Sequence, residues 1–375
     1  MRIQKRIQKR IQKRIQKRIQ MKRYMVFSVC LLFTFGSVVG CRAAAAGNER
    51  IPVRVLIIPK FEVGELSGDT PGEAQYYYEE YLEGGREFTV PGTLGDIRVY
   101  EKDGIVLFMP GMGKVDAALG TLAVLKDDRF DFSKTCIIST GCAGSSVGYG
   151  TLGDVFIITT AVDYDLGHHA DIRDMAADHK EAGTIEDKRT TWFHHEPFDE
   201  LAVVRLNADL TDRVYEMVKD IPLETTEQTR ECLRKNYHDA DWAVRDPRVL
   251  KGTTVTGDNY WKGEHGHNNA VLMVETYDCP DEYAITEMED LAVAKAVRQM
   301  GLLDHFLIIR DSVNLDVFMG NATPESLWAS ESASKSLSSE DSEEAVDIFP
   351  TAMKNNFEVG RVVIDAVLNG ELEMA

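Results

Sequence analysis

Four short segments of the sequence carry side chains that can do chemistry on a small polar ligand. Residues 139–144 combine glycines with small residues directly after an apolar run, so their backbone N–H groups can approach an anion or a hydroxyl. Residues 256–261 place an aromatic pair, Tyr260 and Trp261, beside a Gly-Asp turn. A tight turn and core packing are the plainer explanations of these two patterns, so neither identifies a site by itself.

The other two segments carry carboxylates, an amide and an arginine. Residues 286–290 place Glu and Asp side chains at the predicted start of a helix, where the helix dipole alone favours negative charge. Residues 309–314 run from Ile-Arg-Asp to Ser-Val-Asn at the predicted carboxyl end of a strand. Ligands of open α/β sheets bind outside such strand ends, so this segment is a candidate for contact with one.

These segments need a scaffold, and the chain around them alternates short apolar runs with helical patterns. Runs rich in β-branched residues predict buried strands at residues 53–59, 105–109, 135–140, 154–162 and 305–310. Helical spacing of apolar residues predicts helices at residues 73–82, 114–126, 210–219, 227–236, 287–300 and 350–368. This alternation favours an α/β fold in which a mixed, mostly parallel central sheet is flanked by helices on both faces.

Charge is distributed unevenly along the chain. The formal net charge is −19, from 42 Lys+Arg and 61 Asp+Glu, but residues 1–40 hold 11 of the basic side chains and none of the acidic ones. The rest of the chain therefore carries 31 basic against 61 acidic residues, about −30. A body that acidic repels phosphate backbones, so we expect no nucleic-acid partner.

Residues 1–20 consist of a basic repeat, Arg-Ile-Gln-Lys, with a period of four residues. That period drifts around a 3.6-residue helix, so the isoleucines predict no stable apolar face. Two explanations stay open. Either translation starts at Met21 and the repeat is an in-frame artefact, or the repeat is an unusually long basic leader.

Residues 21–40 have the organisation of a secretory signal, with a basic start and an apolar run at residues 24–39 that ends just before Cys41. They are similar to a bacterial lipoprotein signal, in which the cysteine is lipidated; cleavage near residues 43–46 without lipid is the alternative. A lipid on Cys41 would tether the body, through a linker at residues 41–50, to the cell envelope on its periplasmic side or outer surface. No later stretch approaches the about 18 apolar residues of a span, so we expect membrane contact only through this anchor.

Residues 51–375 are expected to form one domain with a mobile Ser- and Glu-rich insertion at about residues 329–347. The histidine pairs lack the spacing of metal ligands, so we expect no metal and no other cofactor. No CxxC pair is present, which argues against a zinc ribbon or a disulfide-dense scaffold. Whether cysteines pair stays open for Cys136, Cys142, Cys232 and Cys279.

Taken together and in this order, these segments resemble the purine nucleoside permease family, a part of the type I nucleoside phosphorylase superfamily. That superfamily also contains purine nucleoside phosphorylases and methylthioadenosine nucleosidases. The resemblance spans about residues 51–370 and rests on residues 61–64, 68–73, 110–113, 139–144, 163–169, 257–261, 286–290 and 310–314. It implies a nucleoside phosphorylase-like three-layer fold, a purine nucleoside ligand and a homo-oligomer.

The resemblance also implies roles for particular side chains. The superfamily's Met-Glu pair falls on Met288 and Glu289: the carboxylate would accept hydrogen bonds from the ribose 2′- and 3′-hydroxyls, and the methionine would lie against the sugar. Its aromatic shelf for the base matches Tyr260, with Trp261 beside it. His169 is expected near the sugar rather than on a metal.

Two further positions would contact the ligand around the broken bond. Thr140 and Gly141 of the strand-end loop are expected against the substrate. Asn314 stands where many relatives have an aspartate that protonates the purine at N7. Its amide cannot give up a proton, but it can donate a hydrogen bond to N7 and steady the charge that develops there.

The nucleophile is where the sequence departs from phosphorylases. Ser139 stands where those enzymes have a phosphate-binding arginine, which makes water the more available nucleophile. Glu62 or Glu65 would be the general base, and the choice between them stays open. The cations that could still hold phosphate as a co-substrate are Lys60, Lys114 and Arg310.

The expected function is therefore the binding of purine nucleosides, in uptake or salvage, with hydrolysis of the N-glycosidic bond to purine and ribose. The pairing pattern of Asn314 favours 6-oxopurines such as inosine. Two alternatives stay open: a phosphorolytic purine nucleoside phosphorylase, and a non-catalytic nucleoside-binding component of nucleoside transport.

Overall fold

The computed structural model describes residues 49–171, 191–194, 199–237, 240–317 and 348–374. The chain divides into two units at residue 49, and everything below concerns the unit Arg50–Ala375. Several expectations lie outside the described residues: the repeat at 1–20, the signal at 21–40, Cys41, and the insertion at 329–347.

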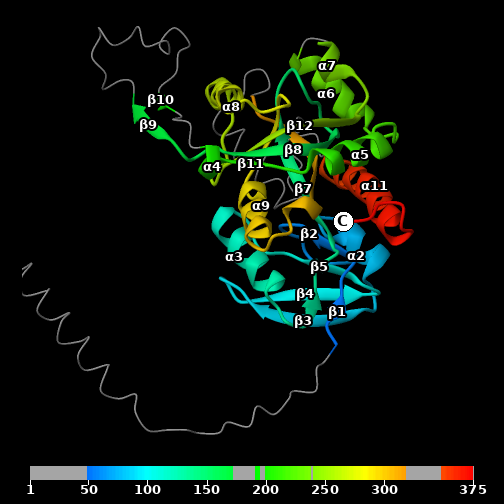
Figure 1. The fold of residues 1–375 in the computed structure, drawn as a ribbon. Coiled ribbons are helices and arrows are strands. Elements are labelled where there is room, and N and C mark those ends of the chain that lie inside the picture. Colours follow the sequence, from blue (N-terminus) through cyan, green and yellow to red (C-terminus); the bar gives the residue numbers. More distant parts are fainter. Residues whose placement is uncertain (1–48, 172–190, 195–198, 238–239, 318–347, 375) are drawn as a thin grey trace, which may run out of the picture. The chain divides into compact units, whose positions relative to one another are not determined.

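The described part of the unit is built on a ten-stranded sheet with the order β11-β8-β12-β13-β7-β2-β5-β4-β3 (Figure 1). A tenth strand, β14, pairs with both β7 and β8, so β8, β12, β13, β7 and β14 form a closed ring of hydrogen-bonded neighbours. The strands are β2 (Val55–Ile58), β3 (Arg86–Pro91), β4 (Asp96–Lys102), β5 (Ile105–Phe108), β7 (Cys136–Ser145), β8 (Val155–Asp163), β11 (Val203–Arg205), β12 (Val249–Thr256), β13 (Tyr283–Glu287) and β14 (Phe306–Leu315).

The expected mixed sheet is confirmed. Parallel pairings join β5, β2, β7 and β14 at its centre, and also β8, β12 and β13. Antiparallel pairings connect these two groups and add β11, β4 and β3 at the edges. Two short pairs stand apart from the main sheet: β1 (Ile51–Pro52) with β6 (Phe130–Asp131), and β9 (His168–Asp171) with β10 (Thr191–His194).

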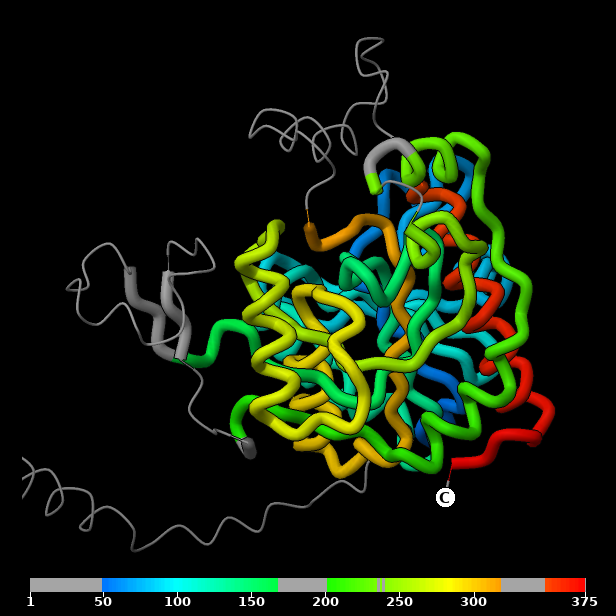
Figure 2. The backbone as a smooth tube through the Cα atoms, turned by 90° about the horizontal axis from the view of Figure 1, so that it is seen from above, coloured from blue at the N-terminus to red at the C-terminus, as the bar shows by residue number. Residues whose placement is uncertain are grey.

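Helices cover both faces of the sheet, so the unit has three layers. Helices α9 and α11 lie on opposite sides of the central strands in both views (Figures 1 and 2). The helices are α2 (Gln75–Tyr81), α3 (Lys114–Leu125), α4 (Asp199–Ala202), α5 (Ala208–Val218), α6 (Glu227–Tyr237), α7 (Asp241–Val244), α8 (Glu264–Thr276), α9 (Asp290–Gln299) and α11 (Phe349–Leu368), with a 3-10 turn at Leu303–His305.

The alternation of side chains along each strand explains the layers. In β2, Leu56 and Ile58 pack into the core beneath α3 and α9, while Val55 and Ile57 pack into the core beneath α2, α5 and α11. All four side chains of β2 are fully buried. A strand buried on both faces needs a continuous apolar run, which is the pattern of its sequence.

The structure extends two of the predicted strands. The strand predicted to end at residue 140 continues to Ser145, because β14 and β13 supply backbone partners for its glycine-rich part. The strand predicted to end at residue 310 continues to Leu315 for the same reason. The predicted helix start at residue 287 is three residues too early, since Glu287 closes β13 and α9 begins at Asp290.

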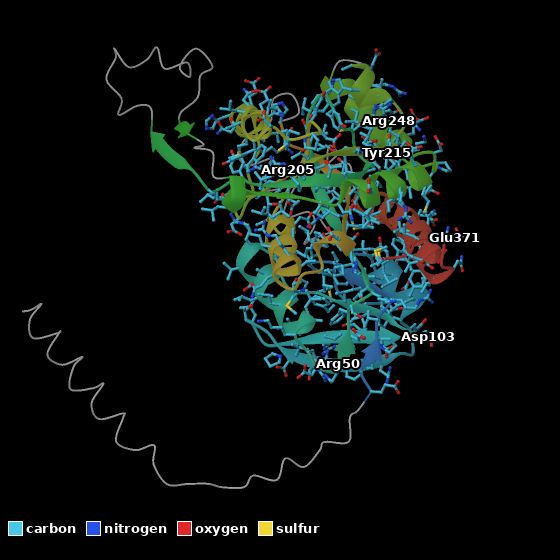
Figure 3. All side chains as sticks on the ribbon, viewed as in Figure 1. Arg50, Asp103, Arg205, Tyr215, Arg248 and Glu371 are labelled. Atoms are coloured by element: carbon cyan, nitrogen blue, oxygen red, sulfur yellow. The ribbon has the colours of Figure 1, made fainter. Side chains whose placement is uncertain are left out.

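The arginine at the end of β11 ties that edge strand to the rest of the unit. Arg205, labelled in Figure 3, donates to the backbone oxygen of Tyr277 at 2.7 Å. Within the described part of the chain, no helix combines the length and the apolar character that a membrane crossing requires.

Candidate functional site

The centre of the candidate site is a buried arginine surrounded by carboxylates. Arg310, on β14, is 1% exposed. Its Nε lies 2.8 Å from Asp290 Oδ2, and its Nη2 lies 3.2 Å from Glu289 Oε2 and 3.4 Å from Glu287 Oε2. Burial alone would lower the pKa of Arg310, but these carboxylates raise it well above its usual range. The guanidinium therefore stays charged and holds the carboxylates in place.

Glu289 connects this cluster to the next layer of the site. It precedes α9, is buried, and uses its second oxygen, Oε1, to accept a hydrogen bond from the backbone N–H of Gly113 at 3.0 Å. Gly113 lies just before α3 with a φ of 80°, a conformation that favours glycine. Met288, next to it, is half-buried. The predicted sugar-binding pair thus lies between β13 and α9, where Glu289 contacts the backbone that leads into α3.

A second buried carboxylate, Glu73, lies on the other side of the arginine. Its Oε1 accepts from the backbone N–H of Cys142 at 2.9 Å, and its Oε2 accepts from the backbone N–H of Lys60 at 2.7 Å. Arg310 Nη1 is 3.9 Å away, and a side chain at Gly141 would collide with the carboxylate. Burial raises the pKa of Glu73 although the two neighbouring cations oppose that shift. A carboxylate in that state is suited to taking up a proton.

An acidic cluster around Lys114 brings the aromatic turn to the same region. Lys114 Nζ lies 2.8 Å from Asp163 Oδ1 and 2.6 Å from Asp165 Oδ2. The backbone N–H of Lys114 donates to Asp258 Oδ1 at 2.7 Å, so the turn at residues 257–261 is held against the start of α3. Burial lowers the pKa of Lys114, but the two aspartates outweigh it and raise the pKa overall.

The two aromatic residues of that turn have different surroundings. Trp261 stacks on Tyr164, with ring centroids 5.1 Å apart, and a side chain at Gly266 of α8 would collide with its ring. Tyr260 is 53% exposed. Trp261 is therefore a packed residue behind the turn, and Tyr260 is the ring that remains accessible; their contact with a base stays a prediction.

Asn314 is brought to the closed ring of strands by an irregularity in β14. The register between β14 and β7 shifts between Ser312 and Asn314, which then pairs with Gly144. A Cβ at Gly144 would lie 2.8 Å from Asn314 Nδ2 and 3.4 Å from Thr286 Cγ2. Because Thr286 lies three residues before Glu289, the amide and the carboxylate predicted to bind the sugar belong to one region of the sheet.

The structure separates two predicted residues from this region. Thr140 is fully buried and its hydroxyl donates to Asn356 Oδ1 on α11 at 2.6 Å, so it faces the helix layer. Glu62 accepts hydrogen bonds from the backbone N–H groups of Ala74 at 2.9 Å and Gln75 at 2.7 Å, which makes it a cap for α2. Burial raises the pKa of Glu62 despite these bonds.

The second predicted base, Glu65, is exposed and lies in a surface groove. The sequence patterns do not single out Glu73, which is the first residue of the helix predicted at residues 73–82 and lies two residues before the observed start of α2. Residues between Lys60 and Glu73 form a loop without a helical or strand pattern, and no local pattern predicts how such a loop folds back. Only the contact with Gly141 and Cys142 identifies Glu73 as part of the cluster.

Ser139 belongs to a buried hydrogen-bond network that also contains Lys60 and Asp290. Lys60 Nζ donates to Ser139 Oγ at 2.8 Å and to the backbone oxygen of Ile58 at 2.6 Å, and Ser139 Oγ donates to Asp290 Oδ1 at 2.6 Å. Burial lowers the pKa of Lys60. The three candidate phosphate-binding cations are thus each engaged by protein groups: Lys60, Lys114 and Arg310.

Cysteines and metal ligands add nothing further to this part of the molecule. Cys136 and Cys142 are free thiols, and no group of three or more His, Cys, Asp or Glu side chains among the described residues is arranged to hold a metal ion. The side chain of His169 lies outside the described residues.

Several known proteins have sequences similar to that of this chain. A probable purine nucleoside permease of Schizosaccharomyces pombe is 27% identical over 229 residues, 57% of this chain and 65% of that protein. A 5′-methylthioadenosine/S-adenosylhomocysteine nucleosidase of Bacillus pumilus is 26% identical over 231 residues, 62% of this chain and 77% of that protein. The chain spans less than two thirds of the length of the permease relatives that it matches.

Among solved structures, a 5′-methylthioadenosine/S-adenosylhomocysteine nucleosidase of Helicobacter pylori aligns with a TM-score of 0.50 at 12% identity, covering 84% of this chain and 99% of that one. This likeness confirms the nucleoside phosphorylase-like fold. The model of the family described as purine nucleoside permease matches residues 52–371, nearly all of the described unit. The chain therefore belongs to the purine nucleoside permease family.

Proposed function

We propose that this protein binds purine nucleosides and hydrolyses their N-glycosidic bond. The observation that carries the proposal is the pair of buried carboxylates, Glu289 and Glu73, on either side of Arg310. Hydrolysis of this bond needs one group that grips the sugar and one that activates water. The names of the relatives, purine nucleoside permease and 5′-methylthioadenosine/S-adenosylhomocysteine nucleosidase, support a purine nucleoside as the ligand.

Glu289 would hold the ribose. Its carboxylate is fixed by the Gly113 N–H and by Arg310, so it is oriented before a ligand arrives. Hydrogen bonds from the ribose 2′- and 3′-hydroxyls to a carboxylate are charge-assisted and strong. The same negative charge stabilises the positive charge that develops on the sugar as the bond to the base breaks. Met288 would pack against the sugar ring.

Glu73 would act as the general base. A water molecule gives a proton to its carboxylate and forms a bond to the anomeric carbon, C1′. The bond between C1′ and the purine breaks, and its electron pair stays on the purine. Both Glu73 and Glu62 accept hydrogen bonds from backbone N–H groups. Glu73 is proposed over Glu62 because it lies 3.9 Å from Arg310, the arginine that also contacts Glu289, whereas the bonds of Glu62 tie it to the start of α2.

Asn314 would recognise the leaving base. Its amide can donate one hydrogen bond to purine N7 and steady the negative charge there. The same amide can donate toward the O6 of inosine or guanosine, whereas the amino group of adenosine needs an acceptor. A buried polar group left unpaired costs about 1–3 kcal/mol, so we propose a preference for 6-oxopurines.

Water rather than phosphate is the proposed nucleophile. A phosphate dianion needs cations that are not already neutralised, and Arg310 and Lys114 are each bonded to carboxylates. Lys60 is buried against Ser139 and backbone oxygens. Phosphorolysis would require several of these contacts to break.

The test is to incubate the protein with inosine and with adenosine, each with and without phosphate, and to identify the sugar product. Ribose that forms at a rate independent of phosphate is the expected result, with inosine the faster substrate. Ribose 1-phosphate that appears only with phosphate would establish phosphorolysis instead. Tight binding of inosine without any free purine would establish the second candidate, a nucleoside-binding component of transport, which the permease name of the family favours.

Two expectations about the setting of this activity are also part of the proposal. A lipid on Cys41 would hold the protein at the cell envelope, where it would process nucleosides for uptake or salvage. A homo-oligomer is proposed as the working form. The described surface carries exposed apolar side chains on the helix that follows Gly113, Val115 at 66% and Leu119 at 51%, which a second copy would cover.

A further inference from the structure

A histidine, an aspartate and a tyrosine form a hydrogen-bonded group outside the residues discussed so far. His267 Nδ1, on α8, lies 2.9 Å from Asp316 Oδ2, and the hydroxyl of Tyr283 donates to the same oxygen at 2.9 Å. The other oxygen, Oδ1, accepts from the backbone N–H of Val147 at 3.0 Å. Asp316 is 0% exposed, while the side chain of His267 is 20% exposed. The aspartate is thus a fixed support, and the imidazole is the member of the group that can be reached.

The stretches of chain that contact Asp316 are directly connected along the sequence to stretches of the candidate site. Asp316 lies two residues after Asn314, directly after the end of β14, and Val147 lies three residues after Gly144, just after the end of β7. Tyr283 begins β13, the strand on which Thr286 faces Gly144.

The aromatic turn reaches the same point, because the backbone N–H of Gly263, two residues after Trp261, donates to the backbone oxygen of Asp316 at 2.7 Å. The group therefore borders the end of the site at which the base is proposed to bind.

The arrangement sets which ring nitrogen of His267 is available. With Nδ1 bonded to Asp316, the atom left for a ligand is Nε2. No described residue is recorded as a hydrogen-bond partner of Nε2. A histidine whose second nitrogen is held by a buried carboxylate is the arrangement that proton-transferring histidines use in many enzymes.

We propose that His267 is the general acid that protonates the departing purine, with Asp316 and Tyr283 as its positioning residues. The inference rests on the proposed hydrolysis and answers a question that Asn314 leaves open. An amide can donate a hydrogen bond to the purine but cannot give it a proton, and a purine anion is a poor leaving group without one. His267 supplies that proton from the neighbouring end of the same strand ring.

The bond between C1′ and the purine nitrogen breaks, and its electron pair remains on the purine ring. The proton on Nε2 of His267 moves to a ring nitrogen of the purine, while Glu73 takes a proton from the attacking water. Transfer of that proton through solvent from Glu73 to His267 restores the enzyme, so one water and one nucleoside give one purine and one ribose.

The experiment compares a purine nucleoside with a riboside whose leaving group needs no proton. Inosine and 4-nitrophenyl riboside are assayed with wild-type protein and with His267→Gln. Glutamine can still donate to Asp316 but cannot transfer a proton. We expect kcat for inosine to fall about 100-fold or more, on the scale of a lost general acid, and kcat for 4-nitrophenyl riboside to change by less than about threefold. Asp316→Asn, which disturbs the ring orientation, should show the same selective loss to a smaller degree.

His265→Gln, on the same helix two residues earlier, is the matched control and should leave both rates near those of wild type. Loss of both rates in His267→Gln with an unchanged Tm would overturn the role of general acid and assign His267 to substrate binding. Unchanged cleavage of inosine would also overturn it, while the proposed hydrolysis would stand. A wild-type protein that cleaves neither riboside overturns the proposed function, and this inference with it.

Discussion

Glu289 and Arg310 are joined by a 3.2 Å contact between Oε2 and Nη2 in a region where both side chains are buried. The second oxygen of Glu289 is held by the backbone N–H of Gly113. The carboxylate is thus oriented from two directions by groups on β14 and before α3. Such an arrangement costs little reorganisation when a sugar binds, which is the physical basis of preorganised electrostatic catalysis.

Glu289→Gln should remove the charge while keeping the shape. We expect a loss of roughly 2–4 kcal/mol of transition-state stabilisation, measured as kcat/KM for inosine, because a neutral amide stabilises the developing positive charge on the sugar far less. Glu282→Gln, an exposed glutamate just before β13, is the control and should leave kcat/KM unchanged. Wild-type kcat/KM and nucleoside affinity in Glu289→Gln would remove this residue from the site.

Glu73 and Glu62 should respond differently to the same substitution. Glu73→Gln removes the proposed base, so kcat should fall by a factor of about 10² to 10⁴. Glu62→Gln weakens a helix cap, so the free energy of unfolding should fall by about 0.5–2 kcal/mol with kcat little changed. Steady-state kinetics and urea unfolding on both variants check this. The reverse pattern would show that Glu62 is the base.

Asp311 should make stability depend on pH. It is 0% exposed, and neither carboxyl oxygen meets the geometry of a hydrogen bond with a described residue. Burial, and then the charge of Glu73, raise the pKa of Asp311 well above its usual range. The folded protein therefore keeps the proton of Asp311 at pH values where the unfolded chain has lost it. The contribution of protonated Asp311 to the free energy of unfolding is full below about pH 4 and is lost as the pH rises toward the pKa of Asp311 in the folded protein.

Asp311→Asn removes that proton exchange while preserving volume. The stability of the variant relative to wild type should therefore increase as the pH rises from 5 to 8, by at most about 1.4 kcal/mol per pH unit. Urea unfolding at several pH values measures the difference, with the exposed Asp96→Asn as a control. A difference that is constant across this range would show that Asp311 is ionised in the folded protein.

Cys41→Ser should change where the protein is found. If Cys41 carries the lipid anchor, wild type will fractionate with membranes and the variant will be soluble, because the acidic body has no other proposed attachment. Fractionation and mass spectrometry of the mature N-terminus provide the measurement. A wild-type protein that begins at Ala43 or later without lipid contradicts the anchor.

Much of the fold follows from local patterns in the sequence. The buried run at β2 and the helical spacing along α3 and α11 have direct local causes, and the structure places these elements within a few residues of their predicted bounds. Local patterns do not predict the three elements that residues 249–287 form in the structure, β12, α8 and β13. The polar residues and short apolar runs of this segment fit no single period. Glu289 was predicted at the site because it lies in a recognisable Met-Glu pair.

What the sequence determined by itself is thus the set of buried strands, the acidic character of the body and the position of the Met-Glu pair. Only the tertiary structure decided that Glu73, rather than Glu62, lies beside Arg310, and that His267 lies against Asp316. These pairs are separated by 237 and 49 residues. Such contacts depend on how loops return to the sheet and on the closure of the strand ring through β14, and neither is encoded in a pattern that spans only a few neighbouring residues.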